Sequence, residues 1–218
     1  MVQSPYYYGD AYYRTPPPDL PSLLLKERII YLGLPIVHQV TELIVAQLLY
    51  LQYEDPEKPI YFYINSTGTS RFDGEPVAWE TEAFAICDTM AYVKPPVHTI
   101  CIGVAMGMAA VLLSAGAKGH RASLPNASII LRQSRSYTRG QASDIQIQAR
   151  EVLRNREVML DILAENTGQP REKIAKDMSR TFYLTPYEAK EYGLIDRVLE
   201  SPRSLPHKAE QAALPGKT

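Results

Sequence analysis

The sequence has few cysteines, no excess of charge of either sign and no long apolar run. Cys87 and Cys101 are its two cysteines, and there is no C-x-x-C pair or Cys/His cluster, which disfavours a structural zinc site and fits a reducing compartment. A net charge of −1 without a basic stripe predicts no nucleic-acid partner. The apolar runs are too short for a membrane span, and the first residues do not resemble a secretory signal. These absences predict a cytoplasmic protein without metal or cofactor.

Composition divides the 218 residues into three segments. Residues 1–22 are rich in tyrosine and proline, which predicts an extended arm without helix, either disordered or used as an aromatic contact surface. Residues 23–200 are long enough for one domain with a sizeable core. Residues 201–218 contain three prolines and predict a flexible tail.

Apolar runs alternate with helical patterns between the two terminal segments. This order predicts an α/β fold of repeated parallel βαβ units, and the continuous apolar character of the strands predicts helices on both faces of the sheet. The expected strands are 28–32, 60–64, 97–102, 129–131 and 194–199. The expected helices are 40–51, 78–92, 107–115, 142–166 and one that starts at the capping sequence Thr185-Pro186-Tyr187-Glu188 and ends at Gly193.

The strand at 97–102, the turn after it and the helix from Gly107 are the centre of the functional analysis. Hydrolases often present a nucleophilic serine at such a turn, beside the free N–H groups of a helix start. Here the turn reads Ala105-Met106-Gly107-Met108, and glycine offers no nucleophile.

The longest helical pattern, residues 142–166, has an apolar stripe that Gly168 ends. Its length predicts a helix that projects from the domain and docks on another subunit, although packing wholly on its own domain is the alternative.

Several short stretches resemble the proteolytic subunit of the ATP-dependent Clp protease, ClpP, in the family's order. They are residues 25–30 (LKERII), 43–47 (LIVAQ), 63–66 (YINS), 112–119 (LLSAGAKG), 124–126 (LPN), 140–145 (GQASDI) and 191–196 (EYGLID). The resemblance covers about residues 23–200. It implies a crotonase-like α/β subunit in seven-membered rings, two of which stack into a tetradecamer around a chamber. The projecting helix then corresponds to the family's handle.

The resemblance also implies where a Ser-His-Asp triad would lie, and this sequence departs from it at each position. The serine position holds Gly107, the histidine position Arg132 and the aspartate position Thr181. Glycine has no hydroxyl, arginine stays protonated at physiological pH, and threonine cannot stabilise an imidazolium as a carboxylate does. The sequence therefore resembles the inactive branch of the family, the ClpR type of cyanobacteria and plastids.

The segment that supplies an oxyanion-binding N–H in the family also differs in this chain. The family has Pro-Gly-Gly where this chain has Thr67-Gly68-Thr69, followed by an insertion at residues 70–77. The backbone N–H groups of Gly68, Thr69 and Met108 are the candidates for an oxyanion-like site. The insertion is either a tolerated surface loop or a loop that fills the vacant cleft or contacts a neighbour. Residues 135–138 replace a glycine-containing segment of the family, which suggests a narrowed peptide groove.

A relocated triad is not expected. Ser114 and Ser134 have no histidine predicted beside them, and His120 is expected to be an exposed loop residue. The remaining histidines, His38, His98 and His207, have no recognisable acid or nucleophile partner.

The sequence thus predicts a non-proteolytic ring subunit of a Clp protease core, in a cyanobacterial cytosol or a plastid stroma. It would co-assemble with active ClpP-type subunits, serve structural, gating and ATPase-docking roles beside an AAA+ Clp ATPase, and let unfolded substrates pass. The alternatives are a ClpP-type serine endopeptidase with a relocated site, and a crotonase-type acyl-CoA enzyme that uses the N–H groups of Gly68 and Met108.

Overall fold

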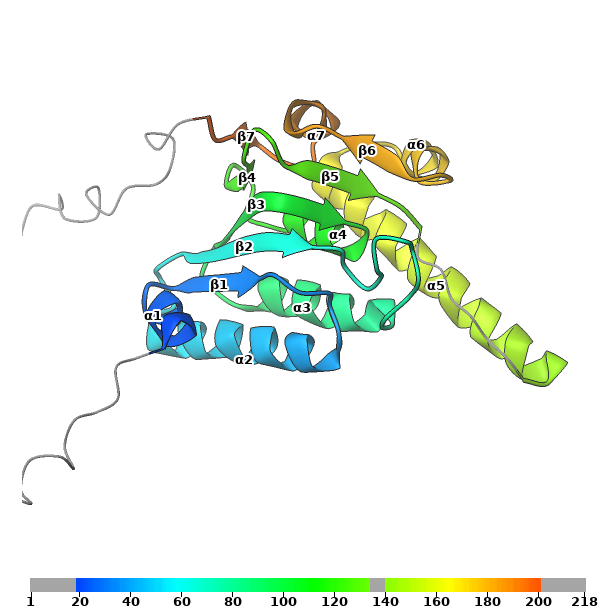
Figure 1. Cartoon of the computed structure of the whole chain (residues 1–218), viewed down its shortest axis with the longest axis horizontal. Helices are drawn as coiled ribbons and strands as arrows, with labels where there is room; N and C mark the ends of the chain where they lie inside the picture. The colour runs from blue at the N-terminus through cyan, green and yellow to red at the C-terminus, as the bar shows by residue number, and fades with distance from the viewer. Residues whose placement is uncertain (1–18, 134–139, 201–218) are drawn as a thin grey trace, which may run out of the picture.

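A computed structural model describes residues 19–133 and 140–200 as one seven-stranded sheet with helices packed against it (Figure 1). The strand order is β1-β2-β3-β4-β7, and β5 pairs with both β3 and β6. All pairs are parallel except β5 with β6, which is antiparallel. The described elements in chain order are α1 (Leu20–Lys26), β1 (Ile29–Leu32), α2 (His38–Glu54), β2 (Ile60–Ser66), α3 (Glu80–Tyr92), β3 (Val97–Met106), α4 (Met108–Ser114), β4 (Arg121–Ser123), β5 (Ser128–Leu131), α5 (Ala142–Thr167), α6 (Arg171–Asp177), β6 (Phe182–Leu184), α7 (Pro186–Tyr192) and β7 (Arg197–Val198). The predicted α/β fold of parallel βαβ units is confirmed.

Helices α2, α3 and α4 cover one face of the sheet and enclose the main core (Figure 1). Strand β2 shows how the two faces differ, because Phe62 and Ile64 are fully buried while Tyr61 and Tyr63, which alternate with them, are partly exposed. On the second face a small apolar cluster gathers around Ile100, Ala122 and Leu199. The expectation that helices cover both faces is therefore wrong for β2, whose continuous apolar run places tyrosines on the more open side.

The 26-residue helix α5 extends well beyond the sheet at its N-terminal end (Figure 1). Its buried residues, Asn155, Met159, Leu160 and Leu163, all belong to its C-terminal half. Ile147 and Leu153 lie nearer its start and are 64% and 55% exposed. The predicted projecting helix is present, and half of its apolar stripe has no cover within the described chain.

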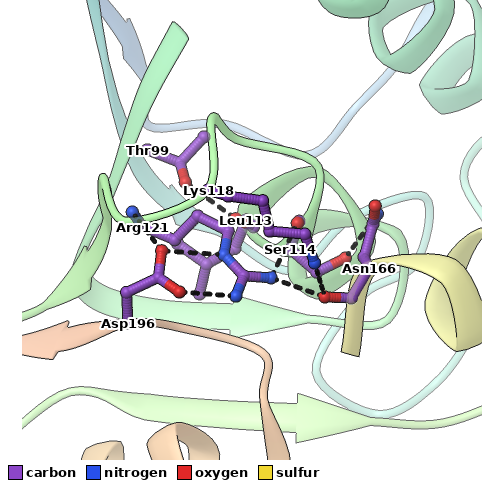
Figure 2. Close-up of polar contacts among 7 residues, drawn as sticks. All are labelled: Thr99, Leu113, Ser114, Lys118, Arg121, Asn166 and Asp196. Carbon is purple, nitrogen blue, oxygen red and sulfur yellow. Dashed lines mark hydrogen bonds and ion pairs between the residues drawn. The ribbon is translucent and has the colours of Figure 1, made fainter. Parts of the chain in front are cut away.

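Arg121, on strand β4, links the C-terminal end of α5 to the sheet (Figure 2). Its side chain is 4% exposed and forms a two-pronged pair with Asp196, with Nη2–Oδ1 at 2.7 Å and Nε–Oδ2 at 3.0 Å. Its Nη1 also donates to the carbonyls of Asn166 at 2.8 Å and Ser114 at 3.2 Å. These carbonyls end α5 and α4, so the cation also lies at the negative ends of two helix dipoles.

Three local features differ from the sequence expectations. Helix α1 begins at Leu20, inside the segment expected to be free of helix, because Pro21 falls in the first turn, where its missing N–H breaks no hydrogen bond. The last strand, expected over 194–199, is reduced to Arg197–Val198. Strands β4 and β6 and helix α6 were not expected at all.

The remainder of the arm at 1–18 and the tail at 201–218 lie outside the described residues, so their predicted conformations remain predictions. No helix in the described ranges is both long and apolar enough to cross a membrane.

Candidate functional site

The turn between β3 and α4 has the backbone shape of a nucleophile elbow. Gly107 connects the two elements with φ 55° and ψ −117°, a region that favours glycine. Its N–H donates to the carbonyl of Ile130 on β5 at 2.8 Å, which fixes the turn against the neighbouring strand. Among the described residues, a β-carbon at Gly107 would meet one neighbour within 4 Å, Cγ of Arg132 at 3.6 Å, an ordinary van der Waals contact. The position would thus hold a side chain, and the sequence supplies none.

Arg132, in the position of the expected base, follows β5 and is 8% exposed. Its Nη2 donates to the carbonyl of Gly74 at 3.4 Å, and its Nη1 lies 3.9 Å from Sδ of Met106. A guanidinium remains charged throughout the physiological pH range and has no acceptor atom. Arg132 therefore cannot take a proton from a nucleophile or from water.

Thr181 immediately precedes β6, and its side chain is exposed. Antiparallel pairing joins Ile130 to Tyr183 and Leu131 to Phe182, so the next step of this register places Thr181 opposite Arg132. The structure thus brings the elements that carry Gly107, Arg132 and Thr181 to one location, and no carboxylate stands among these three.

Gly68 packs directly on the elbow, because a β-carbon there would lie 2.5 Å from the carbonyl of Met106 and 3.0 Å from the nitrogen of Met108. Its N–H donates to Oγ of Ser66 at 3.1 Å, and its carbonyl accepts from Ile36 at 2.8 Å. The N–H of Gly68 is therefore already engaged, contrary to the expectation that it stays available for an oxyanion. This disfavours a crotonase-type site that uses Gly68 and Met108.

Thr69 and Met108 are both buried, 3% and 1% exposed. The carbonyl of Thr69 accepts from the N–H groups of Val77 at 2.9 Å and Ala78 at 3.3 Å, which closes the base of the inserted loop. Among the described residues, the N–H of Met108 has no hydrogen-bond partner, as is usual for the first residue of a helix.

The inserted loop is compact. Ser70 and Pro76 form an isolated antiparallel bridge, Arg71 N–H donates to the carbonyl of Glu75 at 2.8 Å, and Gly74 N–H donates back to Arg71 at 3.0 Å. Gly74 has φ +93°, and a β-carbon there would lie 2.3 Å from Nη2 of Arg132. The positive φ favours glycine at residue 74, and the guanidinium of Arg132 occupies the space beside it.

A hollow of about 630 Å³ lies between this loop and the turn after β1. Gly33–Pro35, Asn65–Thr67 and Arg71–Asp73 line it together with Val104. Oγ1 of Thr67 is buried and has no hydrogen-bond partner among the described residues. The lining does not include Gly107 or Arg132.

The other serine and histidine candidates do not assemble into a triad in the described ranges. Ser114 is fully buried, its Oγ donates to Val111 at 2.7 Å, and it accepts from Asn166 at 3.2 Å. His98 and His120 stack on each other, with ring centroids 4.0 Å apart. Burial lowers the pKa of His98 to about 4, with further contributions from His120 and Arg197. Ser134, residues 135–138 and His207 lie outside the described residues.

His38 differs from the expectation that it has no acid partner. Its ring nitrogens lie 3.2 Å from Glu42 and 3.3 Å from Glu82. The spacing of His38 and Glu42, four residues apart on one helix, could have indicated the first of these contacts. Both contacts are at the exposed start of α2, and no group of three metal-ligating side chains occurs in the described ranges.

A mostly parallel sheet whose third strand enters a tight turn and a short buried helix defines an α/β protein with the backbone arrangement of a nucleophile elbow. A model of the Clp protease family matches residues 17–202, and the chain belongs to this family. The predicted family is thus confirmed.

Several relatives of this chain are named after the proteolytic subunit of the Clp protease. A Synechocystis protein named as an ATP-dependent Clp protease proteolytic subunit-like protein is 66% identical over 94% of this chain and 95% of its own. The chloroplastic proteolytic subunit-related protein 3 of Arabidopsis thaliana is 50% identical over 88% of this chain and 59% of its own. Proteolytic subunit 2 of Gloeobacter violaceus is 54% identical over 89% and 86%. The similarity to a subunit-related protein of chloroplasts supports the ClpR type.

Proposed function

We propose that this chain is a non-proteolytic subunit of a Clp protease core. The observation that carries the proposal is the elbow-shaped turn at Gly107, with Arg132 beside it and Thr181 on the neighbouring register, at the positions where the family resemblance implies a triad. Loss of a complete triad costs on the order of a millionfold in turnover in a serine protease. The chain therefore contributes its shape to the core and leaves peptide cleavage to active ClpP-type subunits in the same rings.

Apolar side chains on the outside of the described chain support assembly with other subunits. Large exposed hydrophobic patches on a protein usually mark interaction sites. On α2 and at the end of α3 the exposed ones are Leu43, Leu49, Tyr50, Tyr53 and Tyr92, which are 42–88% exposed. The uncovered N-terminal half of α5 adds Ile147 and Leu153, in the position of the handle that would join two rings.

The wider roles follow from membership of such a core. An AAA+ Clp ATPase would dock on the rings and deliver unfolded proteins, the Tyr-rich residues 1–18 would take part in gating, and the complex would work in a cyanobacterial cytosol or a plastid stroma. The names of the relatives in Synechocystis and in chloroplasts support this location.

Co-expression with an active ClpP-type subunit from the same source tests the proposal. We expect the two chains to purify as one ring complex, and we expect a serine-reactive fluorophosphonate to label the active subunit alone. Label on this chain would contradict the loss of catalysis, and failure to co-purify would contradict the structural role.

Casein degradation by the isolated chain would instead favour the relocated serine site. Retention of the chain on a CoA resin would favour the acyl-CoA enzyme.

A further inference from the structure

The loop at residues 70–77 is held in one shape by its own backbone. The bridge between Ser70 and Pro76 and the hydrogen bond from Val77 N–H to the carbonyl of Thr69 close its base, while the mutual bonds of Arg71 with Gly74 and Glu75 close its tip. Oδ1 of Asp73 accepts from the N–H of Glu75 at 2.9 Å. Because these bonds fix the tip, the loop can present Gly74 in a defined place.

Gly74 at the tip of the loop lies against the guanidinium of Arg132. The guanidinium donates to the carbonyl of Gly74, and its Nη2 fills the space that a β-carbon on Gly74 would need. The aliphatic stem of the same arginine passes the elbow, with Cγ 3.6 Å from the β-carbon position of Gly107. One side chain thus connects the vacant nucleophile position to the inserted loop, although Arg132 and Gly74 are 58 residues apart in sequence.

The residues at the elbow and just before the inserted loop are buried. Gly107 is buried, Met108 is 1% exposed and Thr69 is 3% exposed, without any partner chain. A working elbow presents its nucleophile to substrate. The described atom nearest to a β-carbon at Gly107 belongs to Arg132, so access to this position depends on where Arg132, and the loop in contact with it, lie.

We propose that the inserted loop is a built-in plug of the disused cleft and that Arg132 is the latch that holds it there. The inference rests on the proposed function, because it assigns the elbow to a peptide cleft that no longer works. It adds that the chain excludes peptide from this cleft, and that restoring the catalytic side chains would not be enough to restore access to it.

A thiol at the elbow measures that access. Gly107→Cys fits the available space, and the native thiols are poor competitors because Cys87 and Cys101 are buried and burial raises the pKa of each to about 11. The readout is the rate of alkylation by a bulky maleimide divided by the rate with iodoacetamide. The pKa of the thiol affects both rates alike, so the ratio reports access.

We expect the ratio to rise about tenfold when Arg132→Ala is added, the effect of losing one buried hydrogen bond from a charged group. Replacing residues 71–75 with Gly-Gly should raise it at least as much. Arg71→Ala is the matched control, because it removes a 65% exposed guanidinium from the same loop and leaves Gly74 in place. An equal ratio for the intact and the shortened loop would overturn the proposal.

Hydrogen exchange provides a second readout without the elbow cysteine. In the unsubstituted chain the N–H groups of Gly74 and Val77 should be protected, and Arg132→Ala should remove most of the protection at Gly74. Unchanged protection would mean that Arg132 is no latch. Neither measurement involves a partner. A failure of co-assembly would therefore contradict the proposed function without contradicting the plug. Free access to the elbow would contradict the plug without contradicting co-assembly.

Discussion

Cγ of Arg132 lies 3.6 Å from the point where a β-carbon on Gly107 would be. The two positions expected to carry base and nucleophile are therefore neighbours, although neither residue can perform that chemistry. The shape of the turn does not depend on a catalytic side chain, because a backbone hydrogen bond from Gly107 to Ile130 holds it and glycine adopts its conformation without strain.

Gly107→Ser should fold and remain inactive. The new side chain has room, and the positive φ should cost about 1–2 kcal/mol in the free energy of unfolding. Arg132 cannot activate the hydroxyl, so neither fluorophosphonate labelling nor casein cleavage should appear. Urea denaturation measures the stability, with Gly119→Ser as control because Gly119 has φ +82° and open space around it. Cleavage by the single variant would show that another base serves this elbow.

Asp196→Asn should destabilise the fold and weaken its dependence on pH. The buried Arg121 would lose its counter-charge, at a cost of about 3 kcal/mol. Burial alone would raise the pKa of Asp196, but the hydrogen bonds and charge of Arg121 outweigh it and hold this pKa below its ordinary value. The pair thus stabilises the native state above the pKa of the unfolded chain, near pH 4, and this contribution is lost as the pH falls through the lower native pKa.

Urea denaturation from pH 7 to pH 2.5 measures this contribution. The exposed pair of Arg154 and Glu151 on α5 provides the control, since Glu151→Gln should change the stability by less than about 0.5 kcal/mol. Equal effects of the two substitutions would remove the special role assigned to Arg121.

His98 should stay neutral at pH values where an ordinary histidine takes up a proton. Burial lowers its pKa to about 4, and the unfolded chain therefore binds more protons between about pH 6.5 and pH 4. Stability should fall as the pH decreases through this window, and His98→Asn should reduce the fall. NMR titration of the imidazole gives the pKa directly. His120→Gln should raise it, and a native pKa near 6.5 would contradict the prediction.

Ile147→Glu and Leu153→Glu should separate folding from assembly. Both side chains are exposed on the projecting half of α5, so the stability of the isolated chain should change by less than about 0.5 kcal/mol. Ring association, measured by native mass spectrometry, should be lost if this half docks on another subunit. Leu160→Ala is the matched contrast, because Leu160 is 3% exposed and its truncation should cost about 2–5 kcal/mol.

Local signals in the sequence predicted most of the regular elements. The capping box at Thr185 is present, with Glu188 and Thr185 each accepting a backbone N–H of the other, because such a cap depends only on residues three apart. The sequence does not reveal the more open side of β2, because tyrosines in a strand look apolar in a sequence pattern whether or not a helix covers them. The proline content of residues 1–22 predicts no helix, although Pro21 is well suited to the first turn of one.

The candidate site depended more on resemblance than on pattern. Thr181 reaches Arg132 only through the antiparallel register of β5 and β6, which no local pattern reveals. The contact of Arg132 with Gly74 joins residues far apart in sequence, so a glycine inside an insertion could suggest a close approach but could not name the partner.

The partly exposed side of β2 and the exposed N-terminal half of α5 affect how stable the protein is in a cell. A copy without bound neighbours exposes Leu153, and in part Tyr61 and Tyr63, to water and to quality control. Partners that bind the native state stabilise it by mass action. The cellular level of this chain should therefore follow the supply of its companions more closely than the rate of its own synthesis.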